Sequence, residues 1–137
     1  MLIYQLEHEY WKADYDPSGF RLGYYASLEE AKEAREQYLS LPGFIDHPEG
    51  FRITKHIVHA ESCSKIWSVD LVFDEYMDDF IAVGVFEDRG VAEKYIEQYR
   101  LLRGDEVEQG RFLVEEHDLG QGAWEEGFIT YYYTEED

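Results

Sequence analysis

Histidines and carboxylates are the side chains with which this sequence could perform chemistry. His56 and His117 occupy matching positions in two similar halves of the chain, and Glu115 and Asp118 lie close to His117. Imidazole with nearby carboxylates suits zinc binding or proton transfer. The spacing matches no standard metal motif, and histidines on strands are more commonly half-buried and hydrogen-bonded. We therefore predict no catalytic residue and no metal ligand here.

A second candidate is the segment Asp14-Tyr-Asp-Pro-Ser-Gly19, which opens like a calcium-binding EF-hand loop. Its closing position needs a bidentate carboxylate but holds Tyr25, and the flanking segments are predicted strands rather than helices. A plain hairpin turn is favoured, and we predict no bound cofactor.

The single cysteine, Cys63, has only His59 and Lys65 as nearby bases and cannot form an internal disulfide. A spacer residue is favoured over a nucleophile, and the chain is more simply a non-enzymatic protein. Met1 leads directly into an alternating strand without a signal-peptide pattern or a long apolar run. These features predict a cytoplasmic location and no membrane span.

Charge is the strongest compositional signal, because the chain carries a net charge of −19. Residues 1–63 hold 11 acids and 6 bases, and residues 64–137 hold 20 acids and 6 bases, so the halves carry −5 and −14. Such a field repels phosphate backbones and anionic lipids and favours a basic protein partner. The alternative is that the acids only keep the protein soluble.

Acidic residues of the second half cluster around two aromatic residues, which could anchor a partner while the carboxylates steer it. The predicted binding residues are Asp74, Glu75, Tyr76, Asp78, Asp79, Glu115, Glu116, Trp124, Glu125 and Glu126. The alternative is a solvated acidic loop beside core aromatics.

An internal repeat positions these residues. Glu36-Gln37-Tyr38 returns as Glu97-Gln98-Tyr99, and the same offset aligns Gly23 with Gly84 and Phe51 with Phe112. We therefore predict one domain, 1–137, built from two copies, 1–63 and 64–137. If the copies were related by a twofold, His56 and His117 could line a pocket between them.

Each copy is predicted to contain two strands, a helix and a third strand. In the first copy, alternation predicts a strand over 2–10 and an extended segment over 20–25. Ser27 and Glu30 form a capping box that starts a helix reaching Leu41, where Pro42-Gly43 ends it. The apolar linker is expected to fold back on the core before a strand over 51–59.

The second copy repeats the pattern with strands over 66–73, 80–86 and 112–119 and a helix over about 88–102. The predicted core stripe of this helix comprises Val91, Ala92, Tyr95, Tyr99 and Leu102. Residues 128–133 predict a seventh strand, and Tyr131-Tyr132-Tyr133 could support a homodimer through its edge. The predicted class is α+β, with tandem β-β-α-β units, a mainly antiparallel sheet and two helices packed on sheet faces.

The motifs Leu41-Pro-Gly-Phe-x-Asp-His-Pro-Glu-Gly-Phe51 and Trp124-x-Glu126-Gly127-Phe128 resemble small bacterial domains of unknown function, here duplicated in tandem. The resemblance implies a fold and a bacterial source, and it implies no activity or catalytic residue. The leading functional hypothesis is an acidic binding protein, such as an immunity or antitoxin-like protein that neutralises a basic effector. The alternatives are a ligand sensor or enzyme with a pocket between the repeats, and a housekeeping domain.

Overall fold

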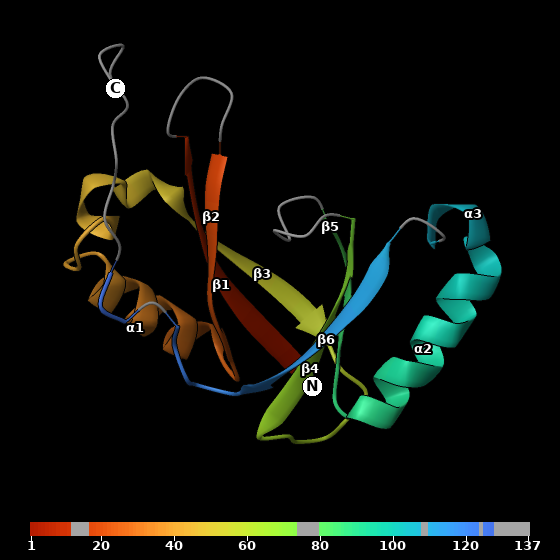
Figure 1. Cartoon of the computed structure of the whole chain (residues 1–137). Coiled ribbons are helices and arrows are strands. Elements are labelled where there is room, and N and C mark those ends of the chain that lie inside the picture. Colours follow the sequence, from red (N-terminus) through yellow and green to blue (C-terminus); the bar gives the residue numbers. More distant parts are fainter. Residues whose placement is uncertain (12–16, 74–79, 108–109, 124, 128–137) are drawn as a thin grey trace, which may run out of the picture. The chain divides into compact units, whose positions relative to one another are not determined.

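The computed structural model describes residues 1–11, 17–73, 80–107, 110–123 and 125–127 (Figure 1). They form an α+β fold with two three-stranded antiparallel sheets, which confirms the predicted class. One sheet has the order β2-β1-β3, from β1 (Leu2–Trp11), β2 (Pro17–Tyr25) and β3 (Phe51–Ile57). The other has the order β5-β4-β6, from β4 (Lys65–Val72), β5 (Phe80–Phe86) and β6 (Arg111–Asp118).

The chain divides into two compact units. The first unit holds Leu2–His56 together with the described residues from Gly120 onward, and the second unit holds Met1 with Ile57–Leu119. Each unit contains one β-β-α-β element. Residues 120–123 and 125–127 therefore pack with the first copy of the repeat, although they belong to the second copy by sequence.

The two hairpins share an irregularity that supports the duplication. Leu6 pairs with Gly23 and is followed by a bulge, and Val69 pairs with Gly84 and is followed by a bulge. The glycines keep the predicted offset, but the stretch from Val69 to Gly84 is shorter than the stretch from Leu6 to Gly23. A gapless repeat was therefore wrong for the first strands, because the connection between the paired positions is shorter in the second copy.

Both helices begin at a side-chain cap in equivalent positions. Before α1 (Leu28–Tyr38), the Ser27 hydroxyl accepts a hydrogen bond from the backbone N–H of Glu30 at 3.1 Å. Before α2 (Arg89–Leu102), the Asp88 carboxylate accepts one from the N–H of Val91 at 3.0 Å. These bonds satisfy N–H groups that have no partner within a helix.

The predicted ends of α1 and β3 were two or three residues too late, and those of β4 and β6 were one residue too late. Helix α1 ends at Tyr38 instead of Leu41, because a residue that precedes a proline is disfavoured in the helical region. Strand β3 ends at Ile57 instead of His59. A short helix, α3 (Gly104–Val107), follows α2. The predicted strand over 128–133 lies outside the described residues.

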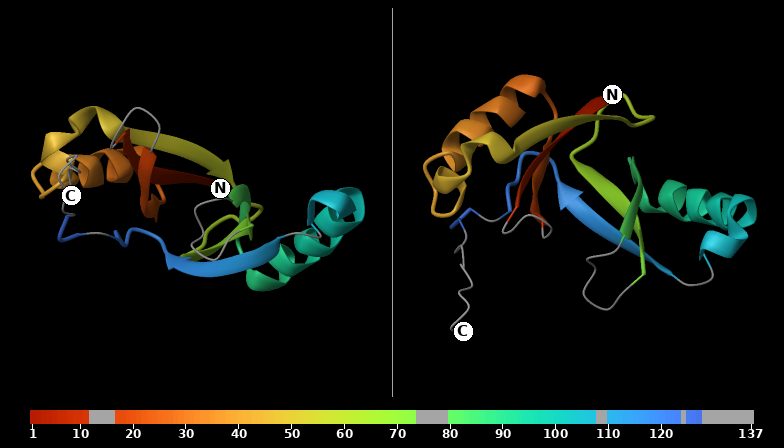
Figure 2. Two further views of the ribbon diagram at one scale, coloured as in Figure 1. Left: turned by 45° about the horizontal axis from the view of Figure 1, so that its top comes forward. Right: turned by 90° about the horizontal axis from the view of Figure 1, so that it is seen from above.

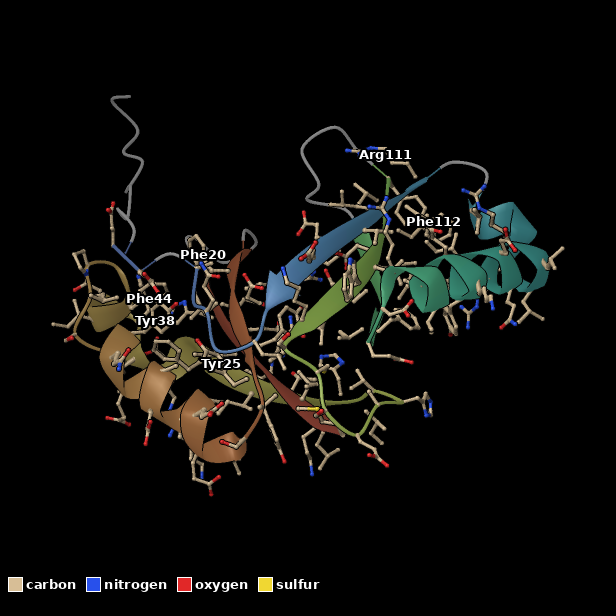
Figure 3. The ribbon with its side chains drawn as sticks, turned by 90° about the horizontal axis from the view of Figure 1, so that it is seen from below. Phe20, Tyr25, Tyr38, Phe44, Arg111 and Phe112 are labelled. Carbon is tan, nitrogen blue, oxygen red and sulfur yellow. The ribbon has the colours of Figure 1, made fainter. Side chains whose placement is uncertain are left out.

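The core of the first unit lies between α1 and one face of its sheet (Figure 2). Its buried members are Leu6, Leu22, Tyr25, Ala31, Ala34, Tyr38 and Phe44. Phe44 comes from the linker, which forms two 3-10 turns, η1 (Phe44–Asp46) and η2 (Pro48–Gly50). The prediction that the linker folds back on the core is confirmed, and Figure 3 shows Phe44 close to Tyr38 and Phe20.

The second unit packs α2 on its sheet with a different stripe from the one predicted. Ala92, Ile96 and Tyr99 are buried, at a spacing of four and three residues that faces one side of a helix. Val91, Tyr95 and Leu102 are exposed, Leu102 by 85%. The prediction missed Ile96 because Val91 and Tyr95 gave an equally regular apolar spacing on the neighbouring side of the helix.

Candidate functional site

The predicted acidic site is partly described on β6. Glu115 lies opposite Ser68 and Glu116 opposite Trp67 of β4. Successive side chains of a strand point to opposite faces, so these two carboxylates lie on opposite faces of the sheet. Their side chains are 49% and 48% exposed, which leaves both accessible to a partner.

Lys65 neutralises part of this charge. Its Nζ lies 2.6 Å from Glu116 Oε1 and 3.4 Å from Asp118 Oδ1, and hydrogen bonds to these carboxylates raise the pKa of Lys65. Glu115 has the ring of His117 at 4.0 Å, and this histidine is cationic only when it is protonated. Lys65 therefore offsets the charge of Glu116 and Asp118, whereas Glu115 faces an imidazole instead of a lysine.

Glu125 and Glu126 belong to the second copy by sequence but lie in the first unit of the structure. Both are exposed in a turn that follows residues 120–123. The remaining predicted residues, Asp74, Glu75, Tyr76, Asp78, Asp79 and Trp124, lie outside the described residues. Four of the ten predicted residues are thus described, and they are divided between the two units.

The segment that carries Glu125 is attached to the first unit by hydrogen bonds. Gly120 N donates to Tyr24 O at 2.8 Å, and Ala123 N donates to Leu22 O at 2.9 Å. The Tyr38 hydroxyl donates to the carbonyl of Ala123. Burial, assisted by the negative charge of Glu125, raises the pKa of Tyr38, so this hydroxyl stays protonated and able to donate.

His56 and His117 occupy equivalent places, each within its own unit. His56 Nε2 lies 2.7 Å from Gln5 Oε1, and His117 Nε2 lies 2.8 Å from Ser68 Oγ. Gln5 and Ser68 are buried, and they directly precede the equivalent residues Leu6 and Val69 on β1 and β4. The repeat therefore preserves a histidine hydrogen-bonded to a buried neutral side chain, which gives each imidazole a structural role in its sheet.

No functional role was predicted for His8, which is almost fully buried in the first unit. Its Nε2 lies 2.7 Å from the carbonyl of His47. A carbonyl can only accept, so this nitrogen carries the proton. The ring of Phe51 packs on it at 4.7 Å between centroids. The alternation of the strand places His8 on the same face as Leu6, and this pattern indicates that His8 is buried.

These buried imidazoles predict acid sensitivity. Burial lowers the pKa of both His8 and His56 from the ordinary 6.5. As the pH falls below about 6.5, these imidazoles become protonated in the unfolded chain while they are still neutral in the folded chain. The free energy of unfolding is therefore highest above about pH 6.5 and decreases as the pH falls. We expect a lower unfolding temperature at about pH 5.5 than at about pH 7.5.

The pH prediction can be assigned to one residue by substitution. His56→Gln keeps a hydrogen-bonding group and removes the titration, so it should flatten the pH dependence measured by thermal unfolding. His59→Gln, at an exposed position, is the control and should leave the dependence unchanged. Equal pH profiles for wild type and His56→Gln would contradict the assignment.

Cys63 has the environment of an unactivated thiol. Its Sγ lies 3.6 Å from Met1 Sδ, and burial raises the pKa of the thiol from 9.0. A nucleophilic cysteine needs a lowered pKa. In the described ranges, no three His, Cys, Asp or Glu side chains gather as metal ligands would.

None of the helices in the described part of the chain combines the length and apolar character needed to cross a membrane. Comparison with protein-family models, with curated proteins and with solved structures finds no match for this chain.

Proposed function

We propose that this chain is a non-enzymatic binding protein that captures a basic protein, in the manner of a bacterial immunity protein or antitoxin that covers an effector. The observation that carries the proposal is the net charge of −19 on 137 residues. A field of this size accelerates association with a cationic surface and opposes association with nucleic acid. A basic protein is the class of partner that the charge favours.

The described acids support a role for β6 in this capture. Glu115 is about half exposed, and Glu116 and Asp118 stand near it on the same strand with Lys65 between them. Carboxylates at the rim of an interface mainly set the association rate and its dependence on salt. The β6 acids would therefore steer the partner, and aromatic residues would supply most of the affinity.

The alternative of an enzyme or ligand sensor with a pocket between the repeats relied on His56 and His117. Each of these imidazoles has a neutral hydrogen-bond partner in its own unit, Gln5 or Ser68. The amide of Gln5 is not a nucleophile, and the Ser68 hydroxyl beside His117 is buried, so it is closed to a substrate. These partners favour the binding protein as the leading proposal.

Affinity capture from the encoding organism tests the proposal. Wild type is compared with Glu115→Gln/Glu116→Gln and with Glu33→Gln/Glu36→Gln, which makes the same charge change on exposed positions of α1. We expect the β6 variant to bind the captured protein more slowly by roughly severalfold, and the α1 variant to bind nearly as wild type does.

Salt supplies the second criterion. Raising NaCl from about 0.05 to 0.5 M shortens the screening length about threefold, so the association should weaken. If the captured protein is acidic, if its binding is unaffected by salt, or if both double variants bind like wild type, the proposal is wrong.

A further inference from the structure

The first unit closes one open edge of its sheet with its own chain. Strand β2 lies at the edge of the order β2-β1-β3, and residues 120–123 run beside it. The carbonyls of Leu22 and Tyr24 accept the hydrogen bonds from this segment. This segment thus covers the edge of β2 over Leu22–Tyr24, where the edge could otherwise pair with another chain.

Strand β5 is the equivalent edge in the second unit. It lies at the end of the order β5-β4-β6, and the bulge at Gly84 matches the bulge at Gly23. By this register, the carbonyls of Val83 and Val85 correspond to those of Leu22 and Tyr24 and point away from β4. Among the described residues, β4 is the only strand that pairs with β5.

The sequence of β5 lacks the features that protect sheet edges. Phe80–Phe86 reads FIAVGVF and contains no charged residue, whereas each of the other described strands contains at least one. Lysine, proline and inward charges normally discourage pairing at an edge. Strand β2 carries both Pro17 and Arg21 although its edge is covered.

Exposed apolar side chains surround the same edge. Phe80 and Ile81 of β5 are 44% and 42% exposed. On α2, Tyr95 is also exposed, and its ring lies 5.1 Å from the ring of Phe86 at the end of β5. Apolar side chains that stay exposed along an uncharged edge strand favour an interaction surface there.

We propose that β5 pairs with β5 of a second copy of this chain, antiparallel about a twofold axis, to give a continuous six-stranded sheet. Charge selects the second copy over a basic partner, because β5 offers no carboxylate to a cation. It is also the strand along which two copies of net charge −19 can approach without placing like charges opposite one another. The bulge is compatible with pairing, since β2 has the same bulge and is paired.

A closed twofold contact is self-complementary, so the expected product is a dimer and not a filament. The inference does not depend on the proposed function. Salt should change the two proposed associations in opposite directions. Screening weakens the capture of a basic protein, but it strengthens the association of two acidic chains. Their failures can therefore be distinguished.

Sedimentation equilibrium of the full chain tests the proposal. We expect a monomer–dimer equilibrium that tightens severalfold as NaCl rises from about 0.05 to 0.5 M, over which the screening length falls about threefold. A chain that remains monomeric at millimolar concentration in high salt overturns the proposal, and so does a dimer that weakens in salt.

Two substitutions locate the contact. Ile81→Lys should weaken the dimer about tenfold or more, since it places a charged ammonium in an apolar contact. Ile45→Lys changes the net charge equally at another exposed isoleucine, in the first unit, and should leave the dimer intact. If Ile81→Lys dimerises as tightly as Ile45→Lys, the contact is not at β5.

A backbone substitution, Val85→Pro, removes an outward N–H without removing a donor to β4. It should abolish dimerisation while the far-ultraviolet circular dichroism stays that of the wild type. Hydrogen exchange gives an independent readout: amides of β5 should exchange more slowly as the protein concentration rises, and amides of β2 should not. Concentration-independent exchange in β5 overturns the proposal.

Discussion

Phe44→Ala is expected to destabilise the first unit by about 3 to 5 kcal/mol, the largest effect of any substitution considered. Phe44 is fully buried, and its ring lies 5.0 Å from that of His8, 5.2 Å from that of Tyr38 and 6.0 Å from that of Phe20. Alanine would leave a cavity among aromatic rings that are held by three different elements, so the site cannot collapse cheaply.

Hydrogen exchange resolved by peptide is the measurement for Phe44, because it reports each unit separately. Protection should fall in β1, β2 and α1 and should change least in β4 and α2. Ile45→Ala is the matched control, since Ile45 is 57% exposed and adjacent in sequence, and it should cost less than about 1 kcal/mol. Equal losses of protection for the two variants would mean that the linker does not belong to the core.

Gly23→Ala is expected to have the second largest effect, roughly 1 to 3 kcal/mol from the backbone alone. Gly23 has φ of +147°, which disfavours any side chain. An added Cβ would also lie 2.8 Å from the carbonyl oxygen of Gln121 and 3.0 Å from the hydroxyl of Tyr25. The substitution should therefore both strain the hairpin and displace residues 120–123 from the edge of β2.

Gly84→Ala is the repeat-equivalent control for this prediction. Gly84 occupies the same bulge but has no positive φ, and an added Cβ would meet the ring of Phe86 at 3.0 Å, a contact that ring movement can relieve. Denaturant unfolding should show a clearly smaller loss for Gly84→Ala than for Gly23→Ala. Exchange at 120–123 should accelerate in Gly23→Ala alone, and equal effects would contradict the proposed role of the C-terminal segment.

Much of the local structure could be predicted because short-range chemistry dictates it. Ser27 with Glu30 predicted the start of α1, since a side-chain oxygen satisfies free N–H groups there. The repeat predicted the start of α2, and the structure shows that Asp88 caps it. Alternation located β1 and β4, and the matching Gly23 and Gly84 revealed the repeat. These patterns depend on residues close together in the sequence, so they do not change with the contacts that distant segments make.

The candidate site was harder to predict because it depends on long-range placement. Glu115 and Glu116 were correctly expected next to His117 on a strand, but the sequence did not show that Glu125 and Glu126 lie in the first unit. No periodicity reports that residues 120–123 return to β2. The bonds that hold them there use backbone groups, which every sequence possesses.

The sequence by itself determined the α+β class, the duplication and the acidic character, since composition, period and capping are local properties. Tertiary structure alone decided that His8 is buried against Phe51, that α2 turns Ile96 inward, and that one sheet edge is covered by the chain while β5 is left with apolar side chains exposed. These outcomes depend on which segments meet although they lie far apart in the sequence. Several alternative contacts between such segments are possible, and local sequence patterns do not indicate which of them form.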